Sequence, residues 1–149
     1  ISACLVGSEM CIRDRSCGLE EAIRQKLDPN LSPTVILQML IEVTGEHVKN
    51  ESEACRVLME GWTLGRTIPT LGEQVHRQHE RVLKVFGQLL HAGVAKSEFR
   101  ADLQVEIQAR LLLAALDGLM VQWHIQPESV DWPRAAEEII RGLQSGSRP

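Results

Sequence analysis

One segment, residues 103–126, constrains the fold most strongly, because its apolar residues occupy two opposite sides of a single predicted helix. At about 100° per residue, one set lies within about 40° of a common direction. This first stripe contains Val105, Ala109, Leu112, Leu116, Leu119 and Trp123. A second set clusters about 200° away, and it contains Ile107, Leu111, Ala114, Gly118, Val121 and Ile125. A surface helix needs only one apolar stripe, so this segment is expected to meet two separate surfaces.

We expect the first stripe to close the core of the chain and the second to meet another copy of it. The alternative is a central helix that is buried on both sides within one bundle. Residues 132–144 favour the partner, because they carry a broad apolar stripe too, and two such terminal helices can form a four-helix dimer interface. The predicted interface comprises Ile107, Leu111, Ala114, Gly118, Val121, Ile125, Ala136, Ile139, Ile140 and Leu143.

The rest of the chain has the periodicity of helices that are separated by short breaks, so the sequence predicts an all-α bundle of about six helices. Ser32-Pro33 is typical of a helix start, and Asn50 and Asp102 are expected to cap the helices that follow them. Ser129 or Asp131 is expected to cap the last helix. The predicted helices span residues 18–27, 33–49, 51–64, 70–95, 103–126 and 132–144.

Composition excludes several classes of protein. The 149 residues suit one domain, and 16 Lys+Arg against 20 Asp+Glu give a net charge of −4, which excludes a strongly basic nucleic-acid surface. An aromatic content of 3% is poor for a base-stacking platform. No apolar run is as long as the about 18 residues that a membrane span needs. The cysteines match neither a zinc pattern nor a disulfide framework. We therefore expect a cytoplasmic protein without a membrane segment.

The first 16 residues differ from the remainder, because they have neither helical nor strand periodicity. They resemble translated read-through of a sequencing adapter, and an ordinary disordered tail is the alternative. We therefore expect residues 1–16 to be a non-native or disordered leader. Residues 17–146 are expected to form one helical domain for ligand binding and dimerisation, followed by a disordered tail at 147–149.

Motifs for catalysis and metal binding are weak. Glu73 and His76 have the E-x-x-H spacing of di-iron bundles, but such sites need a second copy, and the chain has none. His76, His79 and Glu80 lie on neighbouring turns and would need a ligand from another helix to hold a metal ion. No nucleophile elbow or glycine-rich phosphate loop is present. We expect neither an enzyme, nor a metal site, nor a cofactor.

Three motifs occur in order in the C-terminal half. The first motif is a helix-ending turn with Gly93, Ser97, Phe99 and Arg100. The second lies in the next helix and consists of Ala109-Arg110 and Leu116-Asp117-Gly118. The third stands at the start of the last helix and consists of Asp131, Arg134, Ala135, Ala136 and Glu138. This order resembles the C-terminal domain of TetR/AcrR-family transcriptional regulators, over about residues 70–146. The resemblance implies a repressor or activator domain that dimerises as a homodimer and binds a small molecule. It also implies an N-terminal helix-turn-helix, for which residues 1–16 are too few, so we expect DNA binding to belong to a missing domain.

A ligand site is predicted where a polar residue interrupts an apolar stripe. His79 lies between Val75 and Val82 on the helix 70–95, and a polar group at a core position needs a partner. Apolar side chains nearby would form the walls of a cavity for a small apolar or amphipathic effector. The predicted lining is Met59, Trp62, Val75, His79, Val82, Phe86, Leu116 and Met120. The alternative is ordinary core packing in a stand-alone interaction or scaffold domain that binds no ligand.

Overall fold

The computed structural model describes residues 31–144, which form an all-α bundle, as predicted. Its helices are α2 (Pro33–Asn50), α3 (Ser52–Leu64), α4 (Pro69–Ala95), α5 (Val105–Ile125), the short 3-10 helix η1 (Pro127–Ser129) and α6 (Trp132–Gln144). The described part thus has five α-helices. The sixth predicted helix, at 18–27, lies outside the described residues, as do the leader 1–16 and the tail 147–149.

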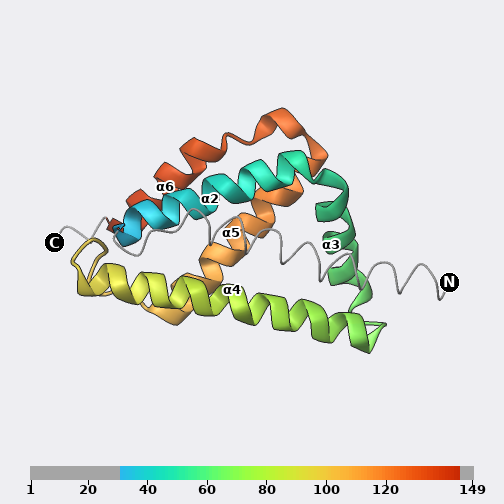
Figure 1. Cartoon of the computed structure of the whole chain (residues 1–149), viewed down its shortest axis with the longest axis horizontal. Helices are drawn as coiled ribbons and strands as arrows, with labels where there is room; N and C mark the ends of the chain where they lie inside the picture. Colours follow the sequence, from blue (N-terminus) through green and yellow to red (C-terminus); the bar gives the residue numbers. More distant parts are fainter. Residues whose placement is uncertain (1–30, 145–149) are drawn as a thin grey trace.

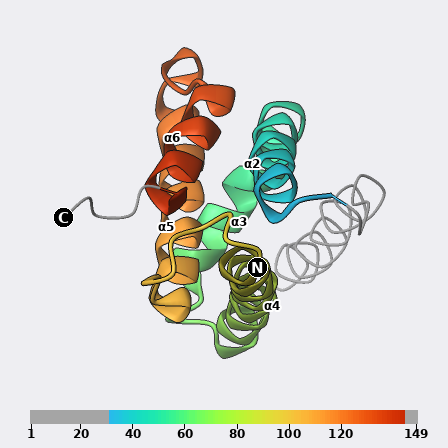
Figure 2. The ribbon, with the colours of Figure 1, turned by 90° about the vertical axis from the view of Figure 1, so that its left-hand side faces the viewer.

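The helices follow a simple path (Figure 1). α2 and α6 lie side by side and run in opposite directions, and α4 forms the long lower edge of the bundle. α5 crosses between them, from the end of α4 to the start of α6, while α3 connects α2 to α4 at one end. Figure 2 shows the bundle from the left-hand side of Figure 1, with the pair α2 and α6 above α4. α5 is therefore the element that contacts α2, α3, α4 and η1.

Local sequence explains where several helices begin. Ser32 caps α2, because its Oγ accepts a hydrogen bond from the Val35 N–H at 3.3 Å, and Pro33 occupies the first turn. Asp131 caps α6 through the N–H of Arg134 at 3.1 Å. The expected caps Asn50 and Asp102 are wrong: α2 continues through Asn50, and Gln104 immediately precedes α5.

The core lies between α2, α4, α5 and α6, and the largest fully buried side chain is that of Trp132. This indole packs directly on α2, where a Cβ at Gly45 would overlap the ring. At the other end, a Cβ at Gly93 would overlap Phe99, and Ser97 adopts a left-handed φ of 58° in the turn after α4. These close approaches fix α6 on α2, and the α4–α5 turn on the end of α4.

In residues 31–144, no helix is both long and apolar enough to cross a lipid bilayer.

Candidate functional site

The two apolar stripes of α5 have different surroundings in the structure. The first is confirmed as a core stripe: Val105, Ala109, Leu112 and Leu116 are buried, and Leu119 and Trp123 pack against that core. The second faces outward. Its exposed fractions are 55% at Ile107, 56% at Leu111, 38% at Val121 and 80% at Ile125. Four large apolar side chains on one side of one helix form a continuous exposed apolar surface, which we call the α5 face.

Two small residues complete the α5 face. Ala114 is exposed, and Gly118 is half-buried with open space where its Cβ would lie. Glycine inside a helix is about 1 kcal/mol less favourable than alanine, and no neighbour within the described chain requires it at position 118. A small residue at an exposed apolar surface permits another backbone to approach closely.

The predicted contribution of α6 to this surface needs correction. Ala136, Ile140 and Leu143 were expected at a dimer interface, but all three are buried in the core of the chain itself. The physical reason is the pairing of α6 with α2, which turns the apolar stripe of α6 inward. Ile139 is half-buried at the edge of this stripe. The predicted interface therefore reduces to the α5 face, with Ile139 as the remaining candidate from α6.

The residues predicted to line a ligand site fall into two groups. Phe86, Leu116 and Met120 are buried in the hydrophobic core. They contact other core side chains because α4 and α5 pack closely along their length. The other group is half-buried at the junction of α3, α4 and α5, and contains Met59, Trp62, Val75, His79 and Val82.

The structure brings two of the predicted residues together and adds a third. The rings of Trp62 and His79 lie 6.0 Å apart between centroids, at 55° to each other. Nε2 of His79 lies 4.0 Å from Oδ2 of Asp117, which comes from α5. The Trp62 indole nitrogen is buried and has no hydrogen-bond partner in the described part of the chain. We call Trp62, His79 and Asp117 the polar junction.

Asp117 is the residue of the polar junction that sequence reasoning did not select. Burial raises its pKa, and the attraction of a charged His79 acts in the opposite direction. Within residues 31–144 it accepts no hydrogen bond, although its side chain is only 30% exposed. The available signal was its position, because Asp117 is the only charged residue in the run from Leu111 to Met120. A poorly solvated carboxylate without a donor is a favourable place for a donor on a ligand.

A groove runs along the other half of the α4–α5 junction. Its volume is about 530 Å³, and Leu83, Gly87, Val105 and Ala109 contribute to its lining together with charged side chains from both helices. A second hollow of about 420 Å³ lies at the turn of residues 97–102. Neither is lined by Trp62, His79 or Asp117. The predicted residues therefore meet at a packed junction and do not surround one of these two hollows.

Metal binding has no geometric support in the part of the chain that the structure describes. Over residues 31–144, no three side chains of His, Cys, Asp or Glu are grouped so that they could hold a metal ion. His76, of the E-x-x-H motif, is exposed on α4.

Comparison with known proteins identifies the domain. A family model described as "BetI-type transcriptional repressor, C-terminal" matches residues 36–144, which span α2 to α6 almost completely. No curated protein and no solved structure matches the chain. The match covers more than half of the chain, and it agrees with the all-α architecture and with the order of motifs around α5. The chain therefore belongs to the BetI-type transcriptional repressors of the TetR family, of which it contains the C-terminal domain.

Proposed function

We propose that this domain forms a homodimer through the α5 face and binds a small effector at the polar junction. In this proposal, effector binding alters the DNA affinity of a helix-turn-helix on the N-terminal side of the domain, in the cytoplasm. The domain itself has no catalytic role. The observation that carries the proposal is the double use of α5, which presents an exposed apolar surface on one side and Asp117 on its flank toward α4.

Dimerisation is supported by the chemistry of the α5 face. Ile107, Leu111, Val121 and Ile125 expose apolar surface that is normally buried in a stable fold. A second copy of the same helix is a suitable cover, because a two-fold axis brings the same apolar patch from both subunits together. Gly118 lets the two α5 backbones approach near that axis. Ile139 lies at the edge of the contact.

Effector binding is supported by two groups of the polar junction. The Trp62 indole N–H lacks an acceptor in the described residues, and the Asp117 carboxylate faces the His79 ring at 4.0 Å, beyond hydrogen-bond distance. Met59, Val75 and Val82 provide half-buried apolar surface around them. We therefore expect a small apolar or amphipathic effector whose polar group meets His79, Asp117 or Trp62. Because α3, α4 and α5 are already in contact, this site opens as the effector enters.

An effector can regulate DNA binding only if it prefers one conformation of the domain. α5 contacts α2, α3 and α4 and also carries the proposed interface. A shift of α5 would therefore change the packing within one subunit and its contact with the other. We propose that the effector-bound and free states differ in the position of α5.

A second candidate function is an interaction or scaffold domain that binds no ligand. The specific observation in its favour is the burial of Phe86, Leu116 and Met120, which fill the interior that a preformed cavity would occupy. Dimerisation is common to both candidates. They differ only in whether a compound binds at the polar junction.

The dimer is tested with two matched valines. Val121 is 38% exposed on the α5 face, whereas Val85 is 44% exposed on another helix, α4. An arginine at position 121 would place a charge in a desolvated interface, at a cost of about 3 kcal/mol or more. Light scattering is expected to give a dimer for the unmodified chain and Val85→Arg, and a monomer for Val121→Arg. A monomeric unmodified chain would refute the proposed interface.

The effector site is tested by a thermal-shift screen of small amphipathic compounds. His79→Leu is expected to weaken the binding of a polar ligand by about 1–3 kcal/mol, because the polar group of the ligand would then be buried without a partner. The exposed His76 on the same helix provides the matched control, His76→Leu. A compound that stabilises the chain equally in His79→Leu, Trp62→Ala and the control binds elsewhere. Absence of any stabilising compound favours the scaffold function.

A further inference from the structure

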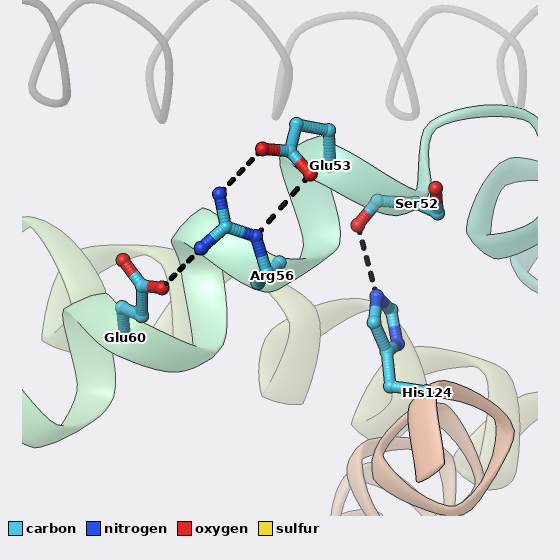
Figure 3. A network of polar contacts seen from close by, with 5 residues as sticks. All are labelled: Ser52, Glu53, Arg56, Glu60 and His124. Carbon is cyan, nitrogen blue, oxygen red and sulfur yellow. Dashed lines mark hydrogen bonds and ion pairs between the residues drawn. The ribbon is translucent and has the colours of Figure 1, made fainter. Parts of the chain in front are cut away.

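His124 connects the end of α5 to the start of α3 (Figure 3). Its Nδ1 lies 3.0 Å from the carbonyl oxygen of Met120, one turn earlier in α5. Its Nε2 lies 2.9 Å from the carbonyl oxygen of Ser52, the first residue of α3. The Trp123 ring packs at 77° to the imidazole with 5.3 Å between centroids, which helps to hold this orientation. Both ring nitrogens of one histidine therefore face hydrogen-bond acceptors.

This geometry distinguishes between the two charge states of the ring. A neutral imidazole has one N–H group and one lone pair, so it donates to one of the two carbonyl oxygens and directs its lone pair at the other. The imidazolium form has two N–H groups and donates to both. His124 also lies in the last turn of α5, where the helix dipole favours a positive charge.

The contact of His124 reaches the first turn of α3. Glu51, which precedes the helix, makes no side-chain hydrogen bond to its first turn. A single residue separates α3 from α2, and η1 follows α5 closely at the same end of the bundle. The bond from Nε2 of His124 to Ser52 is thus a direct link between the first turn of α3 and the end of α5.

We propose that His124 is a proton-dependent clasp between α3 and α5. In the protonated form the ring bonds to Ser52 and Met120 together, and loss of the proton releases one of these bonds. α3 carries Trp62 and α5 carries Asp117, so the clasp also controls how closely the two sides of the polar junction are held. This last step rests on the proposed effector site, whereas the clasp itself does not.

Other charged groups near this junction come from α3, from α2 and from the segments beside them. Glu53 and Arg56 bond to each other along α3, and Arg56 also bonds to Glu60 (Figure 3). The charged and titratable groups on α2, α3 and η1 and between them are Glu42, Glu46, His47, Lys49, Glu51, Glu53, Cys55, Arg56, Glu60 and Glu128, and α4 places His79 beside Trp62 and Asp117. Carboxyl, ammonium and guanidinium groups ordinarily keep their charge between about pH 5 and 8, so His47 and His79 are the neighbours that need controls.

Hydrogen exchange on the full chain tests the clasp. After correction for intrinsic rates, we expect the amide of Cys55, which bonds to the Glu51 carbonyl oxygen at the start of α3, and the amide that follows it to open about tenfold more often at about pH 8 than at about pH 6, as expected for loss of a charged hydrogen bond. His124→Gln is expected to show the more open level at both pH values. His47→Gln and His79→Gln are expected to behave like the unmodified chain. Equal opening of the unmodified chain at both pH values would overturn the proposal, as would pH dependence that survives in His124→Gln.

A measurement on the unmodified chain keeps the proposal testable if the His124 variant does not fold. Nitrogen-15 NMR of the ring reports which nitrogens carry protons. We expect the His124 ring to carry two N–H groups under the conditions in which the start of α3 is protected, and one N–H group under those in which it opens. A ring whose protonation does not change between those two conditions would overturn the clasp. Neither measurement involves an effector, so failure of the proposed effector site would leave this result unaffected.

Discussion

The carboxylate of Glu98 accepts a hydrogen bond from the backbone N–H of Thr34 at 2.9 Å, so a residue of the α4–α5 turn caps the first turn of α2. The N-terminal N–H groups of a helix have no partner within it, and they attract negative charge. Burial acts to raise the pKa of Glu98, but the hydrogen bonds from Thr34 and Ser32 and the nearby charge of Lys96 together lower it. The cap thus connects elements that are 64 residues apart in sequence.

Glu98→Ala is expected to lower the free energy of unfolding by about 1 kcal/mol near neutral pH, which is typical of a lost helix cap. Chemical denaturation measures this difference. Glu137 is exposed on α6 and provides the control, because Glu137→Ala should change stability little. An equal effect of both substitutions would show that the cap contributes nothing.

The same cap predicts a dependence on pH. The folded state lowers the pKa of Glu98 below its ordinary value of 4.5. Its contribution to stability is therefore fully present above that value and is lost as the pH falls through the folded-state pKa. The stability difference between the unmodified chain and Glu98→Ala should shrink under acidic conditions. A difference that stays constant down to about pH 3 would contradict this assignment.

For Asp117 we predict a pH dependence of stability with the opposite sign. Burial raises its pKa in the folded state, so its ionised form destabilises the fold above that pKa, and this penalty disappears as the pH falls below the ordinary value of 3.8. Asp117→Asn should therefore stabilise the chain at neutral pH, with a smaller gain in acid. Denaturation at several pH values measures the gain. Destabilisation by Asp117→Asn at neutral pH would show that the carboxylate has a favourable partner.

Substitution of two helical glycines distinguishes an effect on helix stability from an effect on dimer affinity. Gly87 on α4 and Gly118 on α5 both have open space at the Cβ position. Leucine at either site should favour the helix by up to about 1 kcal/mol. Only Gly118→Leu should also weaken the dimer, since its side chain occupies space that the partner backbone needs. Sedimentation equilibrium of both variants measures this, and equal dimer affinity would remove Gly118 from the interface.

The turn after α4 provides a prediction on packing. A Cβ at Gly93 would overlap the ring of Phe99, whereas Gly142 on α6 has nothing within 4 Å. Gly93→Ala is expected to destabilise the fold by about 1–3 kcal/mol, as overpacking does. Gly142→Ala should be neutral or stabilising. Thermal unfolding of the two variants distinguishes them, and a neutral Gly93→Ala would mean that Phe99 moves aside freely.

Periodicity predicted the side of each helix that is apolar, but it could not identify the surface that covers it. On α5 the core stripe with Leu112 and Leu116 was assigned correctly, because a helix in a bundle must bury at least one stripe. On α6 the same reasoning placed Ala136 and Ile140 at a partner. Their actual cover is α2, 80 or more residues earlier, and no local pattern encodes that pairing.

The polar junction shows that periodicity also could not identify which residues of different helices meet at a site. His79 was selected because it interrupts an apolar stripe, and the structure indeed places it beside Trp62. Asp117 has a similar signal on α5, yet its approach to His79 depends on how two helices cross. Caps were predictable where side chain and turn agree, as at Ser32 and Asp131. The prediction failed at Asn50, where α2 continues almost directly into α3, and at Asp102, because α5 begins only after Gln104.

The packing of Trp132 and Leu143 against α2 has a consequence for synthesis of the chain. Of the described helices, α2 leaves the ribosome well before α6, so the core stays open until α6 has emerged. Contacts between such distant segments close slowly, since a long loop must be ordered before they form. A nascent chain paused before Trp132 therefore exposes the apolar side of α2, and this is the stage at which a chaperone is most useful.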